Sequence, residues 1–503
     1  MQQIKKAVRV GKSSWWKTAC AVCVLCATMA IALQAQTFTT LVNFDGTNGD
    51  GPAYMSLVQG TDGNLYGTTE YGGANGYGTV FKVTPTGTLT TLYSFCVQAN
   101  CADGAYPYPG LVLGTDGQFY GTTNQGGANN SSLCYDDNGC GTVFKIAPSG
   151  KLTTIYNFCA RANCTDGYYP WAALIQATNG SFYGTSEVGG ANDEGTVFSI
   201  TSGGALTTLH SFDGTDGGDP IGALVQATGG NFYGTTASGG ANEEGTVFSI
   251  TSGGALTTLH TFDGTDGNEP FGALIQATNG TFYGTTELGG AHGFGTVFSI
   301  TSGSTLTTLY SFCAQTNCND GEYPTAALVQ ATNGKFYGTT YYGGPNTSCN
   351  DRPGSGCGTV FSITAGGIRT TLHSFGLSDG AVPFGGLVQA TNGTLYGTTF
   401  SGGANDSCGS NLGCGTVFSL AVGLGPFVKT LPTSGKVGAV VKILGTNLTG
   451  ATSVTFNGTP AVFNVMSSSF ITTTVPAGAT TGTVQVVTPG GTLSSNVSFG
   501  VEH

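Results

Sequence analysis

Short runs of β-branched and aromatic residues alternate with glycine-rich segments over most of the chain. The plainest unit, residues 221–262, contains four such runs, at 222–228, 231–236, 245–251 and 255–262. Runs of this length and composition, bounded by turn residues, are typical of strands. We name them strands A to D. Pairs such as Asp62-Gly63 between A and B favour a two-residue type I′ hairpin, so each unit should form one antiparallel sheet.

A Tyr-Gly-Thr-Thr-like step followed by Gly-Thr-Val-Phe marks seven copies of this unit. The steps begin at Tyr66, Tyr120, Tyr183, Tyr233, Tyr283, Tyr337 and Tyr396. Their spacing of 50 to 63 residues is typical of a propeller or solenoid array. Residues 37–44 match strand D with no A, B or C before them, and the seventh unit ends after strand C. We therefore predict an all-β chain in which residues 36–422 form a seven-bladed β-propeller closed by the N-terminal strand, because a linear solenoid would need capping repeats instead.

The repeat pattern stops after Val422. Residues 423–426, Gly-Leu-Gly-Pro, favour a linker, and residues 427–503 contain short alternating runs between Gly, Pro and Asn turns. This spacing is typical of a small Ig-like β-sandwich.

Both parts resemble known families. Segments such as Pro432-Thr-Ser-Gly435 and Val484-Gln-Val-Val-Thr-Pro-Gly-Gly491 closely resemble an IPT/TIG domain. Upstream, the core Leu-x-Gln-Ala-x-Asp/Asn-Gly-x-Phe-Tyr-Gly-Thr-Thr resembles the GloVer tandem repeat of secreted bacterial proteins and recurs in all seven units with small variations. That resemblance implies export and surface display, but no reaction and no catalytic residues.

The first 35 residues have the pattern of a signal peptide: basic residues, then an apolar run from Ala19 to Leu33, then a small residue at Ala35. No other stretch of the sequence approaches the length of a spanning helix. Cleavage would leave 10 basic against 27 acidic residues, a net charge of −17. Because nucleic acid is bound mainly through its negatively charged phosphates, it is an unfavourable partner for so acidic a chain. We expect a secreted or cell-surface monomer.

The twelve cysteines after the leader form six close pairs. The pairs are Cys96/Cys101, Cys134/Cys140, Cys159/Cys164, Cys313/Cys318, Cys349/Cys357 and Cys408/Cys414. An even number, local spacing and an export signal predict disulfides rather than a zinc site, since Cys-x-x-Cys knuckles and nearby His are lacking.

In a propeller the B–C and D–A loops share one face, and every insertion and cysteine pair of this chain falls in those loops. Variable aromatic residues flank the proline that ends each D–A loop, where the chain should reach the mouth of the central channel. These candidates are Tyr106, Tyr108, Tyr169, Trp171, Phe271, Tyr323 and Phe384. Exposed aromatics suit sugar stacking or a protein hot spot. The alternative is that they plug the channel.

Acidic candidates follow the Tyr-Gly-Thr-Thr step, at Glu70, Glu187 and Glu287. Adjacent blades supply no second carboxyl at this position, so a structural or solubilising role competes with a glycosidase pair. The recurring Asp-Gly of the D–A loop favours a turn, and the group Asp213/Asp216/Asp219 leaves structural calcium as an alternative although no complete ligand loop is present. We expect no other metal and no cofactor.

These patterns favour an exported, non-catalytic binding protein that recognises carbohydrate or a surface protein on the B–C/D–A face. Two alternatives stay open. One is a polysaccharide-acting hydrolase or lyase using Glu, Asp and Tyr of the same face, and the other is a structural surface or adhesion component.

Overall fold

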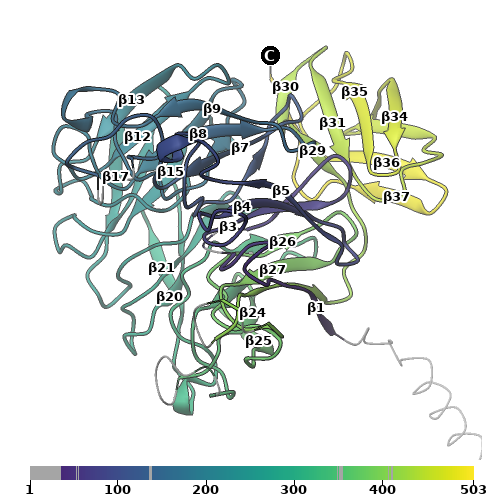
Figure 1. The fold of residues 1–503 in the computed structure, drawn as a ribbon. Coiled ribbons are helices and arrows are strands. Elements are labelled where there is room, and N and C mark those ends of the chain that lie inside the picture. The colour runs from purple at the N-terminus through teal and green to yellow at the C-terminus, as the bar shows by residue number, and fades with distance from the viewer. Residues whose placement is uncertain are drawn as a thin grey trace, which may run out of the picture.

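The computed structural model describes residues 36–502 except 53, 55, 135–138, 348, 350–354, 406 and 409–411. The fold is all-β, with seven four-stranded antiparallel sheets followed by a β-sandwich (Figure 1). The predicted signal peptide, residues 1–35, lies outside the described residues. Among the residues that are described, no helix has the length and apolar character needed to cross a membrane.

Each sheet of the propeller has the strand order A-B-C-D. Blade 1 comprises β2 (Val58–Gln59), β3 (Leu65–Thr69), β4 (Thr79–Val83) and β5 (Leu89–Ser94). Blade 2 comprises β6 (Val112–Leu113), β7 (Phe119–Thr123), β8 (Thr142–Ile146) and β9 (Leu152–Asn157). Blade 3 comprises β10 (Ile175–Gln176), β11 (Phe182–Ser186), β12 (Thr196–Ile200) and β13 (Leu206–Ser211). Blade 4 comprises β14 (Val225–Gln226), β15 (Phe232–Thr236), β16 (Thr246–Ile250) and β17 (Leu256–Thr261). Blade 5 comprises β18 (Ile275–Gln276), β19 (Phe282–Thr286), β20 (Thr296–Ile300) and β21 (Leu306–Ser311). Blade 6 comprises β22 (Val329–Gln330), β23 (Phe336–Thr340), β24 (Thr359–Ile363) and β25 (Arg369–Ser374). Three D–A loops contain a 3₁₀ turn: η1 (Ala99–Cys101), η3 (Ala162–Cys164) and η4 (Thr316–Cys318).

The seventh blade is built from both ends of the propeller sequence. It comprises β26 (Val388–Gln389), β27 (Leu395–Thr399), β28 (Thr416–Ala421) and the N-terminal β1 (Thr37–Asn43). Strand β1 runs antiparallel to β28, from the pair Thr37/Ala421 to the pair Asn43/Thr416. The prediction that the N-terminal strand closes a seven-bladed ring is therefore confirmed.

The innermost strands are shorter than the sequence predicted. Strand A of blade 4 was expected over 222–228, yet β14 has two residues. A Cβ on Gly222 would lie 2.7 Å from Thr235 Oγ1 and 3.2 Å from the carbonyl oxygen of Phe271. The blades converge at these strands, and hydrogen bonds between blades replace hydrogen bonds within the sheet. One example is the bond from Thr285 Oγ1 of blade 5 to the carbonyl of Ala326 of blade 6, at 2.9 Å.

The A–B hairpins also differ from the predicted type I′ turn. In blade 1 the N–H of Gly60 donates to the carbonyl of Asn64 at 2.8 Å, and Gly63 N–H donates to the carbonyl of Gly60 at 3.1 Å. Gly63 has a φ of 81°, whereas Asp62 does not have a positive φ. The loop is thus a three-residue hairpin in which glycine takes the left-handed position. Asp62 stabilises it by accepting the N–H of Asn64 at 3.1 Å.

Aromatic pairs join neighbouring blades. Tyr183 of the repeated step stacks on Phe232 of the next blade, with ring centroids 4.0 Å apart. This stack occurs at five junctions, while Leu65 and Leu395 replace the Phe at the other two. A second pair, such as Phe212 with Phe248, occurs at all seven junctions. The repeated residues therefore hold blades together as well as shaping hairpins.

The C-terminal region forms two four-stranded sheets, ordered β29-β31-β35-β34 and β33-β32-β36-β37, and a parallel pair β30-β38. The strands are β29 (Lys429–Leu431), β30 (Ser434–Lys436), β31 (Val440–Leu444), β32 (Ser453–Phe456), β33 (Thr459–Pro460), β34 (Phe463–Ser467), β35 (Phe470–Thr474), β36 (Val484–Thr488), β37 (Gly491–Ser494) and β38 (Gly500–Glu502). Both sheets contribute to one core, for example Ile443 and Ile471 with Val484 and Val486. The predicted β-sandwich is confirmed.

Candidate functional site

The D–A loops place two variable positions side by side at the inner rim of the loop face. In every blade the residue before the loop proline has a left-handed backbone. These pre-proline residues are Gly51, Tyr106, Tyr169, Asp219, Glu269, Tyr323 and Val382, with φ between 51° and 59°. The backbone carbonyl of each accepts a hydrogen bond from the backbone N–H of the residue after the Tyr-Gly-Thr-Thr step. For example, the carbonyl of Glu269 accepts the N–H of Glu287 at 2.9 Å. Non-glycine residues adopt this conformation at a cost of about 1–3 kcal/mol, and such residues cluster at functional sites. We term this rim the channel mouth.

Four half-buried aromatic rings from different blades meet at the channel mouth. Tyr108 and Trp171 stack with ring centroids 4.6 Å apart. Tyr54 contacts Phe384 at 4.5 Å, Trp171 at 5.1 Å and Tyr108 at 5.4 Å. Since Tyr54 belongs to blade 1 and Trp171 to blade 3, the rings reach past the blade between them. We term these four residues the aromatic cluster.

Three of the seven predicted aromatics belong to this cluster, and Tyr54 was missed. The D–A loop before blade 1 is one residue longer than that before blade 4, so Tyr54 is offset from the expected position. The other candidates lie elsewhere. Tyr106 packs on Tyr71 at 5.7 Å and on Tyr77 at 5.4 Å, and Tyr323 packs on Phe294 at 5.6 Å. Phe271 is half-buried. Tyr169 is only 4% exposed, so its ring is not open to a ligand.

The predicted acids lie among these rings. Glu70 is 3% exposed. Burial raises the pKa of Glu70 to about 7, and the charge of Asp50 also raises this pKa. Hydrogen bonds from the hydroxyls of Tyr71 and Tyr108 lower the pKa and so oppose the effect of burial. Glu70 Oε2 is buried and has no hydrogen-bond partner among the described residues. A solubilising role for Glu70 is therefore wrong.

Glu187 and Glu287 occupy the same position in blades 3 and 5. Burial raises the pKa of Glu187 to about 7, helped by the charge of Asp219 and opposed by a hydrogen bond from the Trp171 side chain. Burial likewise raises the pKa of Glu287 to about 7, with the charge of Glu269 adding to it. Glu70 and Glu187 thus hold the polar ends of Tyr108 and Trp171.

A second carboxyl from a pre-proline position acts on each of these acids: Asp219 on Glu187 and Glu269 on Glu287. From the sequence, Asp219 was considered for calcium only, and aromatic residues were selected at the pre-proline positions, so neither acid was predicted as a partner of Glu187 or Glu287. The pKa of Glu269 is itself raised, by burial and by the charge of Glu244. The channel mouth therefore has an aromatic side over blades 7, 1, 2 and 3 and carboxyl pairs over blades 3 to 5.

Comparison with known families decides where the chain belongs. The sequence profile of the Gloeobacter/Verrucomicrobia repeat matches residues 27–138 and 133–351. The chain belongs to this repeat family. The profile of the IPT/TIG domain matches residues 427–501. No curated protein matches the sequence.

Solved structures similar to this Gloeobacter/Verrucomicrobia repeat protein are distant. A periplasmic gluconolactonase from Pseudomonas aeruginosa is 16% identical, with 78% of this chain and 97% of the other covered and a TM-score of 0.42. A structure titled putative 6-phosphogluconolactonase from Bacteroides uniformis is also 16% identical, with 66% and 88% covered and a TM-score of 0.41. Neither similarity bears on the site or its chemistry.

In this Gloeobacter/Verrucomicrobia repeat protein the D–A loop Asp links the loop to strand D. Asp103 accepts the hydroxyl of Tyr93 at 2.8 Å and the backbone N–H groups of Val97 and Gln98. The same link occurs in six blades, as Tyr93/Asp103, Tyr156/Asp166, His210/Asp216, His260/Asp266, Tyr310/Asp320 and His373/Asp379. These Asp residues are structural. In the sequence, the sign of this link is that one position of strand D holds either Tyr or His, both of which can hydrogen-bond to a carboxylate.

The calcium alternative finds no support in these loops. Asp213 accepts the backbone N–H and the hydroxyl of Thr215 as well as the N–H of Asp216, and Asp216 binds His210. These bonds of Asp213 Oδ1 and of both Asp216 oxygens fit the turn role of the loop. In the part of the chain that the structure describes, three potential metal ligands converge at two places, and both include disulfide cysteines.

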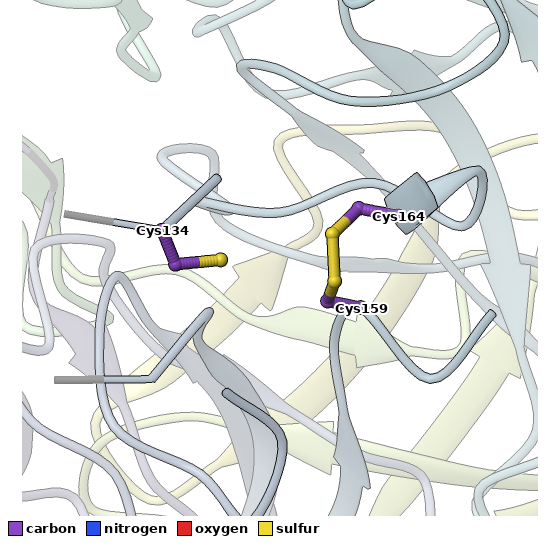
Figure 2. A group of neighbouring side chains, drawn as sticks. All are labelled: Cys134, Cys159 and Cys164. Carbon is purple, nitrogen blue, oxygen red and sulfur yellow. A yellow bond between two sulfur atoms is a disulfide. The ribbon is translucent and has the colours of Figure 1, made fainter. Parts of the chain in front are cut away.

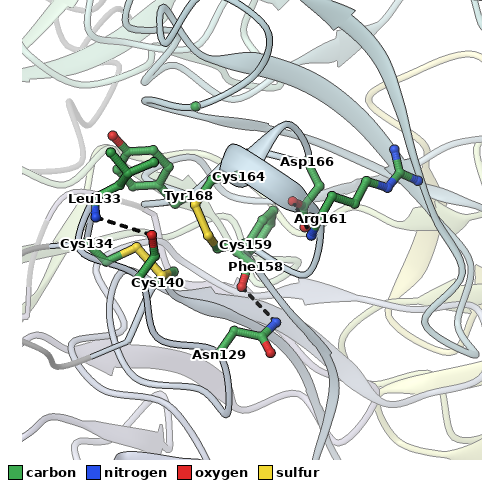
Figure 3. The surroundings of a disulfide bond; sticks show 12 residues. Asn129, Leu133, Cys134, Cys140, Phe158, Cys159, Arg161, Cys164, Asp166 and Tyr168 are labelled. Carbon is green, nitrogen blue, oxygen red and sulfur yellow. Dashed lines mark hydrogen bonds between the residues drawn. A yellow bond between two sulfur atoms is a disulfide. The ribbon is translucent and has the colours of Figure 1, made fainter.

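The repeat protein contains disulfides at all six predicted cysteine pairs. They are Cys96–Cys101, Cys134–Cys140, Cys159–Cys164, Cys313–Cys318, Cys349–Cys357 and Cys408–Cys414. The sulfurs of Cys134, Cys159 and Cys164 lie within 4.8 Å of one another (Figure 2). Two of the disulfides therefore lie next to each other, in the B–C loop of blade 2 and the following D–A loop (Figure 3). Because these cysteines are oxidised, they offer no thiolate to a metal. Disulfides of this number place the folded chain in an extracytoplasmic compartment.

Cys357 lies in the B–C loop of blade 6, between β23 and β24, and forms the predicted disulfide with Cys349. Within this loop it also pairs with Gly343 in an isolated parallel β-bridge. Cys357 is fully buried, and its carbonyl accepts the N–H of Val382, the pre-proline residue of blade 7, at 3.0 Å. This disulfide therefore connects the loop insertion to the backbone of the channel mouth.

Proposed function

We propose that this protein is an exported, non-catalytic binding protein that recognises carbohydrate chains at the channel mouth. The aromatic cluster carries the proposal, because Glu70 and Glu187 fix the polar ends of Tyr108 and Trp171. Rings held in one orientation lose little entropy on binding, and half-buried faces next to polar groups suit stacking on sugar rings. A protein of the cell or host surface is the alternative partner.

The test is a glycan array with the mature chain, followed by calorimetry on any glycan retained. Trp171→Ala and Tyr108→Ala should each weaken binding at least about tenfold, the loss typical of a hot-spot ring. Phe294→Ala, a half-buried aromatic of the same face that contacts Tyr323, is the matched control and should bind as wild type. Full affinity in both cluster variants would refute the site.

A hydrolase or lyase acting on polysaccharide is the second candidate, and the carboxyl pairs favour it. A carboxylic acid with a pKa near 7 retains a proton for general-acid catalysis at neutral pH. Glycosidases use a second carboxyl near the first, and the charges of Asp219 and Glu269 act on Glu187 and Glu287 and raise their pKa values. New reducing or unsaturated ends that disappear in Glu287→Gln would establish this function. Retention without turnover would exclude it.

A structural surface or adhesion component is the third candidate, and it predicts self-association without a discrete ligand. We expect a monomer on size-exclusion chromatography, which would count against that role. Cell fractionation distinguishes release into the medium from retention at the cell surface.

A further inference from the structure

The IPT/TIG domain covers the A–B turns of three blades, at the end of the propeller opposite the channel mouth. In blades 7, 1 and 2 the second residue of strand A is buried: Gln389 is 1%, Gln59 7% and Leu113 5% exposed. The equivalent glutamines of blades 3 to 6 are only half-buried. The domain is therefore placed around blade 1 and does not extend evenly over the ring.

An apolar contact anchors the domain between blades 1 and 2. Leu444 on β31 is 4% exposed and belongs to the same apolar cluster as Leu113, Tyr66 and Phe119 of the propeller. It does not belong to the cluster that forms the core of its own domain. Leu113 stands where six blades have glutamine. The exception in the repeat therefore coincides with the docking site.

Polar contacts reach across the junction of blades 7 and 1. Buried Thr391 of blade 7 donates its N–H to Gln59 Oε1 of blade 1 at 2.9 Å, and its hydroxyl meets Thr446 of the IPT/TIG domain at 3.0 Å. Its carbonyl accepts the N–H of Phe427 at 3.0 Å. On blade 1, Ser469 of the domain donates its hydroxyl to the carbonyl of Thr61 at 2.8 Å. The domain thus binds both sides of this junction.

The one break in the covalent ring lies inside blade 7, because β1 joins β28 by hydrogen bonds alone, whereas residues 44–57 connect β1 to blade 1. The domain follows β28 in the chain and also binds blade 1, which follows β1, so its contacts bridge the two sides of this break. The adjoining junction of blades 7 and 1 is one of the two without a Tyr–Phe stack, since Leu65 stands in place of the Phe. We propose that the IPT/TIG domain is a clamp that holds the propeller ring closed across the β1/β28 pairing. The partner of its β29-β31-β35-β34 sheet is accordingly the propeller of the same chain.

Hydrogen exchange of the full mature chain tests the clamp. Leu444→Asp should undock the domain, seen as faster exchange at residues 58–62 and 389–393. If the domain is a clamp, exchange at β1 and β28 then rises at least tenfold while that at β11 and β19 stays unchanged. Val462→Asp, at a residue 86% exposed on the same domain, is the control and should leave all these rates unchanged.

Three outcomes would overturn the proposal. One is undocking with unchanged exchange at β1 and β28. Another is a uniform rise in every blade, which would indicate general destabilisation. The third is a domain that stays docked in Leu444→Asp and also in the double variant Leu431→Asp/Leu444→Asp, in which half-buried Leu431, packed against the same cluster, is changed as well. The apolar contact would then not be its anchor.

Discussion

Phe44 and Phe81 pack edge to face, with ring centroids 5.2 Å apart and an interplanar angle of 66°. Phe44 follows β1 and completes blade 7, whereas Phe81 lies in β4 of blade 1. Their contact at the junction of blades 7 and 1 repeats a pair that is found at every other junction. The first and last blades are thus joined by the same packing as the rest.

Phe44→Ala should therefore destabilise the whole propeller. Phe44 is fully buried, and removing a buried phenylalanine costs about 3–5 kcal/mol. Urea unfolding followed by circular dichroism measures the change. A loss below about 1 kcal/mol would mean that β1 is not docked in solution.

Stability should decrease as pH rises through neutrality. The pKa values of Glu70, Glu187 and Glu287 are raised from 4.5 to about 7 on folding, so the folded state holds protons that the unfolded state loses. Their contribution is complete below pH 4.5 and is lost by about pH 7. Thermal unfolding should show a higher Tm at pH 5 than at pH 8, with a smaller difference in Glu70→Gln. A Tm that rises over this range would contradict the assignment.

The fluorescence of Trp171 should report the ionisation of Glu187. Trp171 is the one tryptophan of residues 36–503, and its side chain bonds to Glu187. A pH titration of the emission should give an apparent pKa of about 7. Glu187→Gln should abolish the transition, while Glu287→Gln should leave it. If the transition were unaltered in Glu187→Gln, the emission of Trp171 would not report the ionisation of Glu187.

Reduction of the disulfides should weaken the protein without unfolding it at 25 °C. The bonds close loops with sequence separations of 5 to 8, each worth about 2–2.5 kcal/mol in the chain-entropy view. The inter-blade aromatic pairs do not depend on them. Far-UV circular dichroism with reductant should keep the native spectrum while the Tm falls. Loss of the spectrum would show that the loops are essential to the fold.

The blade number and the closing strand were predictable because both repeat a pattern within one unit. The Tyr-Gly-Thr-Thr step was counted correctly, but its stacking on the next blade was missed. Periodicity within a unit does not say which face of Tyr183 packs on its neighbour. Likewise, Asp-Gly is compatible with two hairpin types, and only the backbone of Asp62 decides between them.

The candidate site was predicted in part, for a related reason. Trp171, Tyr108 and Glu187 were found as departures from the repeat. Tyr54 was offset by the longer loop, and Asp219 was considered for calcium only. Glu269 was not predicted as the partner of Glu287 because the contact between these pre-proline and post-step positions depends on the left-handed backbone. Such contacts arise between segments far apart in the sequence of a blade, and the spacing alone does not reveal them.

Titration of the mature chain with oligosaccharides, followed by Trp171 emission and by calorimetry in parallel, tests the channel-mouth proposal most directly. For a glycan retained on the array, we predict a saturable change in emission with the calorimetric Kd and an at least tenfold weaker Kd in Tyr108→Ala. Calorimetric binding with unchanged Trp171 emission and unchanged affinity in Tyr108→Ala would place the binding site elsewhere and contradict the proposal.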